Sequence, residues 1–285
     1  GQLGNVSVVS LLAQTAAATS GDEQKTARES LYRLRDPAVD GAILAAIPEA
    51  EPKIKVELIS SVGQRNISAG VSILLKTANR ESWNVNRESS LEPRATSEEM
   101  SGRVRAESFK ALKVIAGPQH LPALVELLIN VQSTSDRNQA EKTVVAVAHK
   151  IEDKNRQGQA VLAVLPSVEE SERRCSLLNV LGKIGDSSAL PCLREALESS
   201  DAEIQGAAIR ALADWPTSEP APLLLNVAQS SGNRQHRILA LRGAVRLLGL
   251  DSRPSAGAGA RALAAGGAGW PGRPAKETIE MYSRA

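Results

Sequence analysis

The side chains best suited to catalysis or metal binding are few and scattered in this sequence. The three histidines are His120, His149 and His236. None of them shares a predicted helical face with another histidine, a cysteine or an acid pair at the spacing that metal ligands require. We therefore interpret each histidine as a solvated or capping residue, and we expect no metal site and no catalytic residue.

The two cysteines, Cys175 and Cys192, lie on consecutive predicted helices. They stand at different distances from the turn near Asp186, so their side chains should not meet, and we interpret both as small buried hydrophobic residues. The acidic pair Glu169-Glu170 falls at a predicted helix start, where it suits the helix dipole rather than acid–base chemistry. Nucleophile motifs and glycine-rich phosphate loops are absent from the sequence, so we expect neither an enzyme nor a cofactor.

Composition restricts the class of protein further. The 285 residues are 42% hydrophobic and 23% charged, as in ordinary soluble domains, but only 2% are aromatic. The core must therefore consist of Ala, Leu, Val and Ile. The net charge of +2 gives no global field that would attract nucleic acid or a membrane surface. No apolar run reaches the length of about 18 residues that a membrane span requires.

A repeated aliphatic pattern organises most of the chain. Residues 111–128 match residues 180–197 at six positions when the two segments are offset by 69. Further offsets of 31, 53 and 28 extend the same register in both directions. The unit is roughly 30 residues long, and a less regular copy is expected within 134–165. One column of the register contains Leu31, Ile59, Leu112, Leu181 and Leu212.

Each unit predicts two helices. Phe109, Leu112 and Ile115 belong to one apolar stripe with the period of a helix. Breaks such as Gly117-Pro118 and Gly185-Asp186 combine a residue that ends a helix with one suited to starting the next. A single hairpin of this kind has no partner for its apolar stripe, whereas stacked hairpins share it. The pattern predicts an all-α protein, an α-solenoid of stacked antiparallel helix pairs with about seven repeats; the alternative is an ordinary helical bundle with accidental similarity.

Several short motifs carry a family resemblance. They are Val104-Arg105 followed by Ala111-Leu112, and the run Leu-Gly-Lys-Ile-Gly-Asp at 181–186. These motifs resemble HEAT repeats, especially the short bacterial kind similar to the HEAT-like repeats of phycobilisome lyases. The resemblance covers about residues 5–250 and implies the fold, but it does not imply lyase activity. Similar bacterial arrays often accompany another domain, including sugar-hydrolase-like or c-type haem domains of envelope proteins, although this stretch has no Cys-x-x-Cys-His motif.

The sequence divides into two parts. Residues 1–253 are expected to form the solenoid, with a polar insertion loop at 79–101 inside one repeat. Trp83 in this loop either fastens the loop to the solenoid or anchors a partner, because exposed tryptophans are enriched in binding hot spots. Residues 254–285 are rich in Gly, Ala and Arg, and we expect a frayed or disordered segment there.

Two sets of residues are candidates for binding. One column of the register is expected to lie exposed on the second helix of each unit, along the concave face of the solenoid. Its charges differ from copy to copy, which fits partner recognition and equally an unconstrained solvated face. The column consists of Glu29, Glu57, Lys110, Asn179 and Arg210.

The second set is a basic patch in the last repeat. Residues 232–273 have a net charge of +6, whereas residues 1–231 have a net charge of −4. This patch suits an acidic partner or a phosphate backbone, but aromatic residues that would stack on bases are missing around it. We therefore consider nucleic acid an unlikely partner. The patch contains Arg234, Arg237, Arg242 and Arg246.

Together these observations favour a non-enzymatic scaffold that presents a curved surface to a protein partner or a neighbouring domain. An accessory or regulatory region of a larger bacterial envelope enzyme is the first alternative, and a nucleic-acid-binding solenoid is the second. We expect a monomer. The sequence slightly favours the cytoplasm, and the bacterial envelope or periplasm stays open if this sequence belongs to a longer exported chain.

Overall fold

The computed structural model describes residues 6–36, 38–79 and 94–251, without the side chains of 94–98 and 251. Within these residues the chain forms fourteen α-helices and no strand, which confirms the predicted all-α class. The odd-numbered helices are α1 (Ser7–Ala18), α3 (Ala38–Ala46), α5 (Val71–Ala78), α7 (Leu121–Asn130), α9 (Gln159–Val164), α11 (Leu190–Leu197) and α13 (Ala221–Ser230). The even-numbered helices are α2 (Gly21–Arg33), α4 (Pro52–Gln64), α6 (Arg94–Ile115), α8 (Thr134–Ala148), α10 (Ser171–Ile184), α12 (Ala202–Ala213) and α14 (Arg234–Asp251).

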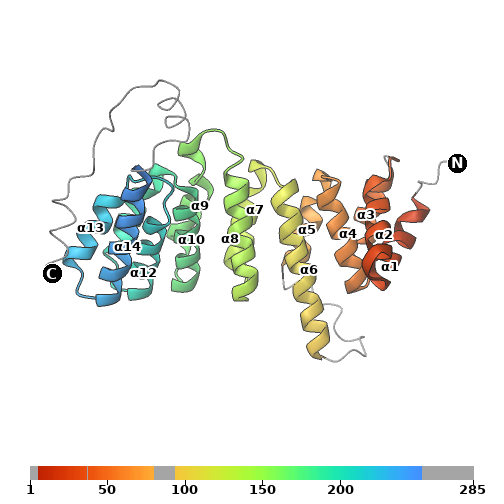
Figure 1. Cartoon of the computed structure of the whole chain (residues 1–285), viewed down its shortest axis with the longest axis horizontal. Helices are drawn as coiled ribbons and strands as arrows, with labels where there is room; N and C mark the ends of the chain where they lie inside the picture. Colours follow the sequence, from red (N-terminus) through yellow and green to blue (C-terminus); the bar gives the residue numbers. More distant parts are fainter. Residues whose placement is uncertain (1–5, 37, 80–93, 252–285) are drawn as a thin grey trace, which may run out of the picture.

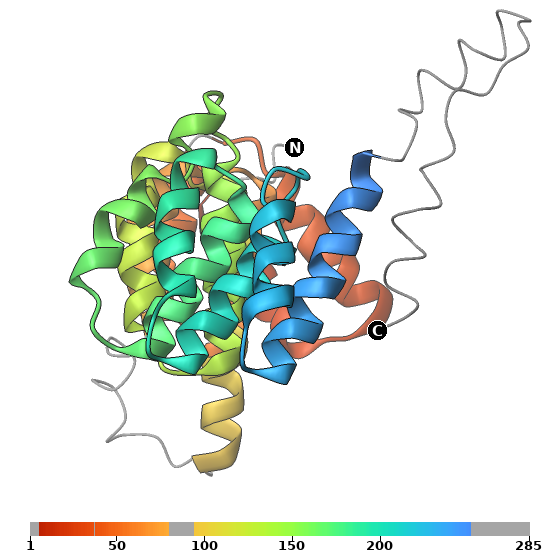
Figure 2. The same cartoon turned by 90° about the vertical axis from the view of Figure 1, so that its left-hand side faces the viewer.

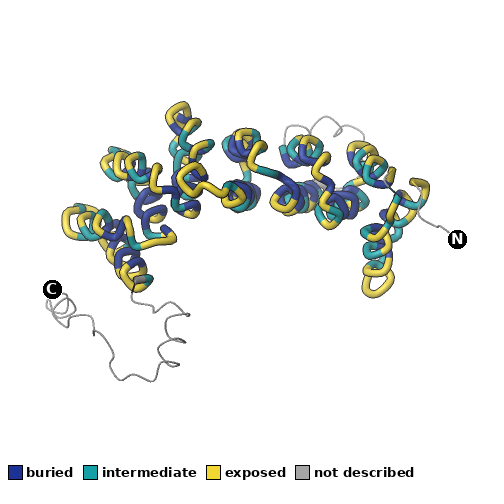
Figure 3. Tube along the Cα trace, turned by 90° about the horizontal axis from the view of Figure 1, so that it is seen from above, coloured by how far each residue is buried: buried dark blue, intermediate teal, exposed yellow. Residues whose placement is uncertain are grey.

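Successive helices form pairs that stand side by side in a row, from α1 and α2 at one end to α13 and α14 at the other (Figure 1). Seen from above, the row is curved, and both of its ends bend to the same side (Figure 3). The even-numbered helices from α4 to α14 pack each against the next. This arrangement confirms the predicted α-solenoid, and the irregular copy expected within 134–165 contains α8 and α9.

The core runs along the whole row as one cluster of aliphatic side chains, from Val9 in α1 to Leu247 in α14. Buried segments lie on the sides where the helices face one another (Figure 3). The aliphatic column predicted from the repeat occupies this core without exception, because each of its five members is completely buried: Leu31, Ile59, Leu112, Leu181 and Leu212. Each layer is thin, so it is filled mainly by aliphatic side chains, and two buried aromatic residues, Phe109 and Trp215, also belong to the cluster.

The turns follow the capping signals of the sequence. Gly185 ends α10 with a φ of 73°, a left-handed conformation that glycine adopts without steric cost. The carboxylate of Asp186 then accepts hydrogen bonds from the backbone N–H of Ser188 at 2.9 Å and of Gly158 at 2.7 Å. Asp186 therefore both caps the next turn and ties it to the preceding pair. Pro191 follows in the first turn of α11, where its missing N–H costs no hydrogen bond.

Cationic side chains satisfy the carboxyl ends of several even-numbered helices. The last carbonyls of a helix have no partner within the helix and carry partial negative charge. In three places a cation from the next even-numbered helix, or from the turn that follows it, donates to these carbonyls at 2.6–3.3 Å. Arg65 donates to Leu31, Tyr32 and Leu34, Lys150 to Val114 and Ala116, and Arg246 to Ala213 and Trp215.

Glycine and alanine set the distance between the even-numbered helices. An added Cβ on Gly182 of α10 would lie 2.4 Å from the Cα and carbonyl oxygen of Ala211 in α12. On the other side of α12, a Cβ on Gly243 of α14 would lie 2.6 Å from the Cβ of Ala213. Both distances are too short for non-bonded carbon atoms, so a larger residue at either glycine would force the helices apart.

The prediction of an insertion loop at 79–101 is wrong for the carboxyl-terminal part of this range. Helix α6 begins at Arg94, so residues 94–101 are helical. The amino-terminal turns of α6 project beyond the other helices of the row (Figures 1 and 2). Because a projecting helix has little to pack against, its sequence lacks the apolar stripe from which we predict helices. Trp83 and residues 254–285 lie outside the described residues.

The contact of Gly182 with Ala211 gives a stability prediction with a matched control. Gly182→Ala should lower the free energy of unfolding by about 1–3 kcal/mol, because the new methyl group overlaps the backbone of α12. Gly41→Ala makes the same chemical change in α3, where no atom lies within 4 Å of the added Cβ. That variant should gain up to about 1 kcal/mol, since alanine favours the helix. Urea unfolding followed by circular dichroism measures the free energy of unfolding of both variants. Equal changes in the two variants would contradict the close contact at Gly182.

Candidate functional site

The five residues of the predicted binding column all lie on even-numbered helices. Lys110 on α6 and Arg210 on α12 are exposed, and Glu29 on α2 and Asn179 on α10 are partly buried. Glu57 on α4 is only 4% exposed, so the expectation that it lies on a solvated face is wrong. The remaining four stay candidates for binding, and the concave position of their face stays a prediction.

Glu57 is buried because it forms an ion pair with the neighbouring helix. The guanidinium of Arg28 on α2 donates to both carboxylate oxygens of Glu57, each at 2.6 Å. This bidentate hydrogen bond is the main cause of a raised pKa of Arg28, and the charge of Glu107 on α6 adds to it. The repeat register places Glu57 on the correct helix but does not reveal that a cation on α2 faces it.

Similar ion pairs join α6 to α8 and α8 to α10. The guanidinium of Arg105 on α6 contacts the Asp136 carboxylate on α8 at 2.6 Å, and both side chains are largely buried. Arg137 on α8 forms an ion pair with Glu172 on α10. The ammonium of Lys183 on α10 reaches back to the buried carboxylate of Glu141 on α8 at 2.9 Å. These pairs hold neighbouring helices in register, because an unpaired buried charge would be strongly destabilising.

A groove on the face of α6 and α8 contains one predicted binding residue. It has a volume of about 260 Å³ and is lined by Lys110, Lys113 and Glu107 from α6 and by Gln139 and Lys142 from α8. Phe109 and Thr143, both buried, also line it. The Lys110 ammonium lies 3.2 Å from the Glu107 carboxylate.

Lys113 and Lys142 give this groove its positive charge. Both are exposed, and neither has a charged partner among the described residues. Sequence analysis misses Lys142 because α8 belongs to the irregular copy of the repeat, where the register does not identify equivalent positions. It misses Lys113 because the column that it follows on α6 contains Lys110 alone. Their convergence with Lys110 makes the groove electropositive and suited to a carboxylate group.

The predicted basic patch lies on α14, the last helix of the row. Arg234, Arg237, Arg242 and Arg246 are all exposed. Arg246 donates to the carbonyls at the end of α12, and Arg237 donates to the Ser231 carbonyl at 3.1 Å. These acceptors are neutral carbonyl groups, so they do not compensate the positive charge of the two arginines.

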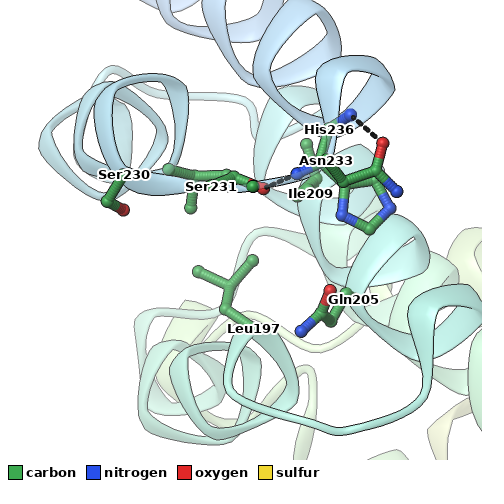
Figure 4. A pocket seen from close by; sticks show the side chains of 9 residues that line it. Leu197, Gln205, Ile209, Ser230, Ser231, Asn233 and His236 are labelled. Carbon is green, nitrogen blue, oxygen red and sulfur yellow. Dashed lines mark hydrogen bonds between the residues drawn. The ribbon is translucent and has the colours of Figure 1, made fainter.

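A second pocket, of about 250 Å³, lies between the ends of α11 and α13 and the starts of α12 and α14 (Figure 4). His236 lines it and is buried, so the expectation that all histidines are solvated or capping residues is wrong here. The pocket also contains Gln205 and Asn233. Asn233 accepts from the Gln235 N–H at 2.9 Å, and Gln205 donates to the Ser199 carbonyl at 2.6 Å. These polar groups are used for capping and turn formation rather than arranged around His236.

The other two histidines and the cysteines act structurally. His120 accepts from the Gly117 N–H at 3.1 Å, and His149 lies 3.4 Å from the Ile184 carbonyl, so both cap turns as expected. Cys175 and Cys192 are free and partly buried, and burial raises the pKa of each thiol. A raised pKa makes a thiol a weaker nucleophile at neutral pH. Within the described ranges, no three His, Cys, Asp or Glu residues come together in a way that would hold a metal ion.

Comparison with known proteins identifies the repeat. Residues 158–245, from the turn before α9 to the middle of α14, match the family model of HEAT repeats. A comparison with curated proteins finds no match for the chain. Among the described helices, none combines the length and the apolar character required to cross a membrane.

Replacing the buried Glu57 should destabilise the fold. In Glu57→Gln, the Arg28 guanidinium loses its carboxylate partner, and we expect a loss of about 1–3 kcal/mol in the free energy of unfolding. Glu29→Gln is the control, because Glu29 forms only an exposed pair with Arg33 at 3.5 Å on the same helix. That change should cost about 0.5 kcal/mol or less. Chemical denaturation of both variants measures the difference, and similar losses would argue against a structural role of Glu57.

Asp201 at the start of α12 should make stability depend on acidic pH. Its carboxylate accepts from the Ser171 hydroxyl of α10 at 2.5 Å and from the Glu203 N–H at 2.8 Å, and these bonds lower its pKa. A lowered pKa contributes stability that is present above the pKa of the unfolded chain and lost as the pH falls through that of the folded protein. The temperature of thermal unfolding should therefore fall less between about pH 6 and about pH 3 for Asp201→Asn than for the wild type. An identical acid dependence would exclude this contribution.

Proposed function

The chain is a HEAT-repeat protein, and we propose that it acts as a non-enzymatic scaffold whose groove between α6 and α8 binds an acidic segment of a partner. The partner is another protein or a neighbouring domain. HEAT repeats form helical scaffolds for protein interaction, which supports the general role. The groove supports the choice of ligand.

The positive charge of the groove is the observation that carries this proposal. Lys113 and Lys142 stand exposed on facing helices without charged partners, whereas Glu57, Asp136 and Glu141 are all engaged in ion pairs. Cations that the fold does not use for its own links are free to bind a ligand. Carboxylates of a partner would complement them and give specificity against basic segments.

The structural use of the other ionisable groups supports the non-enzymatic part of the proposal. The buried carboxylates join helices, two histidines cap turns, and the pKa of each cysteine is raised by burial. Trp215, an aromatic residue of the kind that stacks on bases, lies in the turn that follows α12. Trp215 is completely buried there, which disfavours a role in base recognition.

Charge reversal in the groove tests the proposal. We expect Lys113→Glu/Lys142→Glu to retain a captured partner at least about tenfold less than the wild type, because repulsion replaces attraction. The control is Lys53→Glu/Lys154→Glu, which changes the net charge equally at exposed sites outside the groove. Affinity capture from the native organism with quantitative mass spectrometry measures the retained partner, and circular dichroism verifies the fold of each variant.

Two outcomes would contradict the proposal. Equal retention by the groove variant and the wild type would mean that this face is not used for binding. Captured material that disappears after nuclease treatment, and binds with a steep dependence on salt, would indicate a nucleic-acid-binding solenoid instead.

A further inference from the structure

Helix α14 has apolar residues on two opposite faces. Ala240, Ala244 and Leu247 are completely buried against the row. The outer face has four large apolar side chains, spaced by three, four and three positions, which places them in one stripe along the helix. They are Ile238, Leu241, Val245 and Leu248, with exposed fractions of 41%, 41%, 64% and 46%. Large apolar side chains grouped on an exposed face commonly mark an interaction site.

The position of α14 in the row indicates what shape would cover it. Helix α12 packs between α10 and α14, whereas among the described helices α14 has an even-numbered neighbour only on the side of α12. Figure 2 views the row from the end that contains α14. The spacing of the outer stripe is that of a seam between two packed helices. A further helix, placed as the next even-numbered helix would be, therefore fits this face.

Charge indicates the chemistry of that helix. Residues 232–250 contain four arginines and no acidic residue, and none of the four arginines forms an ion pair among the described residues. Inside the row, three of the four ion pairs between even-numbered helices join a cation on the earlier helix to an acid on the next one. By the same pattern, a helix packed on the outer face of α14 should supply carboxylates.

We propose that the outer face of α14 is a docking site for an amphipathic helix of a partner protein, with an apolar stripe flanked by acidic residues. The stripe of Ile238, Leu241, Val245 and Leu248 packs against the apolar side of this helix, and Arg234, Arg237 and Arg242 pair with its carboxylates. A second copy of this chain is a poor occupant, because it would bring the same arginines against one another. This site is separate from the groove between α6 and α8 and does not depend on it.

Two model peptides provide the direct test. Both are as long as α14, 18 residues, and carry leucines in the same stripe. One has glutamates at the flanking positions and the other has lysines. Fluorescence anisotropy with the full chain should show binding of the glutamate peptide and at least about tenfold weaker binding of the lysine peptide.

Variants of α14 locate the binding. Leu241→Gln/Val245→Gln should weaken binding of the glutamate peptide at least about tenfold by removing apolar contact. Leu11→Gln, at an exposed position of α1 at the other end of the row, should leave the binding unchanged. Arg234→Glu/Arg242→Glu should reverse the preference in favour of the lysine peptide. All these side chains are exposed, and circular dichroism verifies that helicity is retained.

Several results would overturn the proposal. One is equal affinity for the two peptides, and another is binding that persists in Leu241→Gln/Val245→Gln. A dimer in analytical ultracentrifugation that dissociates in the same variant would show that a second copy covers α14. Co-sedimentation with anionic phospholipid vesicles, without binding of the glutamate peptide, would show that the face binds a lipid surface.

Discussion

Close packing between even-numbered helices is the constraint on which the rest of the structure depends. A helix pair of this length has too little apolar surface to fold alone, so its stability comes from the neighbouring pair. Gly182 and Gly243 allow α12 to approach both α10 and α14 closely. The aliphatic column that contains Leu112 then fills a thin continuous core together with other, mainly aliphatic, side chains. The choice of glycine and alanine at the contacts thus determines both the spacing of the row and the size of the core residues.

Polar side chains complete the same interfaces in a different way. Ion pairs such as that of Arg28 with Glu57 lie beside the aliphatic core and join adjacent even-numbered helices. Cations such as Lys150 close the carboxyl end of the preceding even-numbered helix by donating to its free carbonyls. Since these groups already pair within the fold, the charged residues that have no partner are the candidates for binding a ligand. Two groups of such charges, at the groove between α6 and α8 and on α14, belong to the two proposed binding surfaces.

The sequence predicts the core of this protein far better than its surface. Aliphatic residues at helical spacing have one favourable environment, so the register alone places Leu31 and Leu212 correctly in the core. A charged residue has two favourable environments, solvent and contact with a residue of opposite charge. Glu57 shows that the register does not distinguish between them. The sequence does not reveal Lys142, because its helix departs from the repeat. It does not reveal the start of α6 either, because turns that project from the row need no apolar stripe. Long-range pairing, rather than local pattern, decides these positions.

The ties between the even-numbered helices run only from one pair to the next. Arg65, Lys150 and Arg246 each reach back to the end of the preceding even-numbered helix, and no described ion pair skips a helix pair. Tension along the row therefore passes through its interfaces in series, and the weakest interface yields first while the others stay folded. A ligand that bridges two neighbouring pairs stiffens the single joint that it spans and leaves the curvature elsewhere free to adapt.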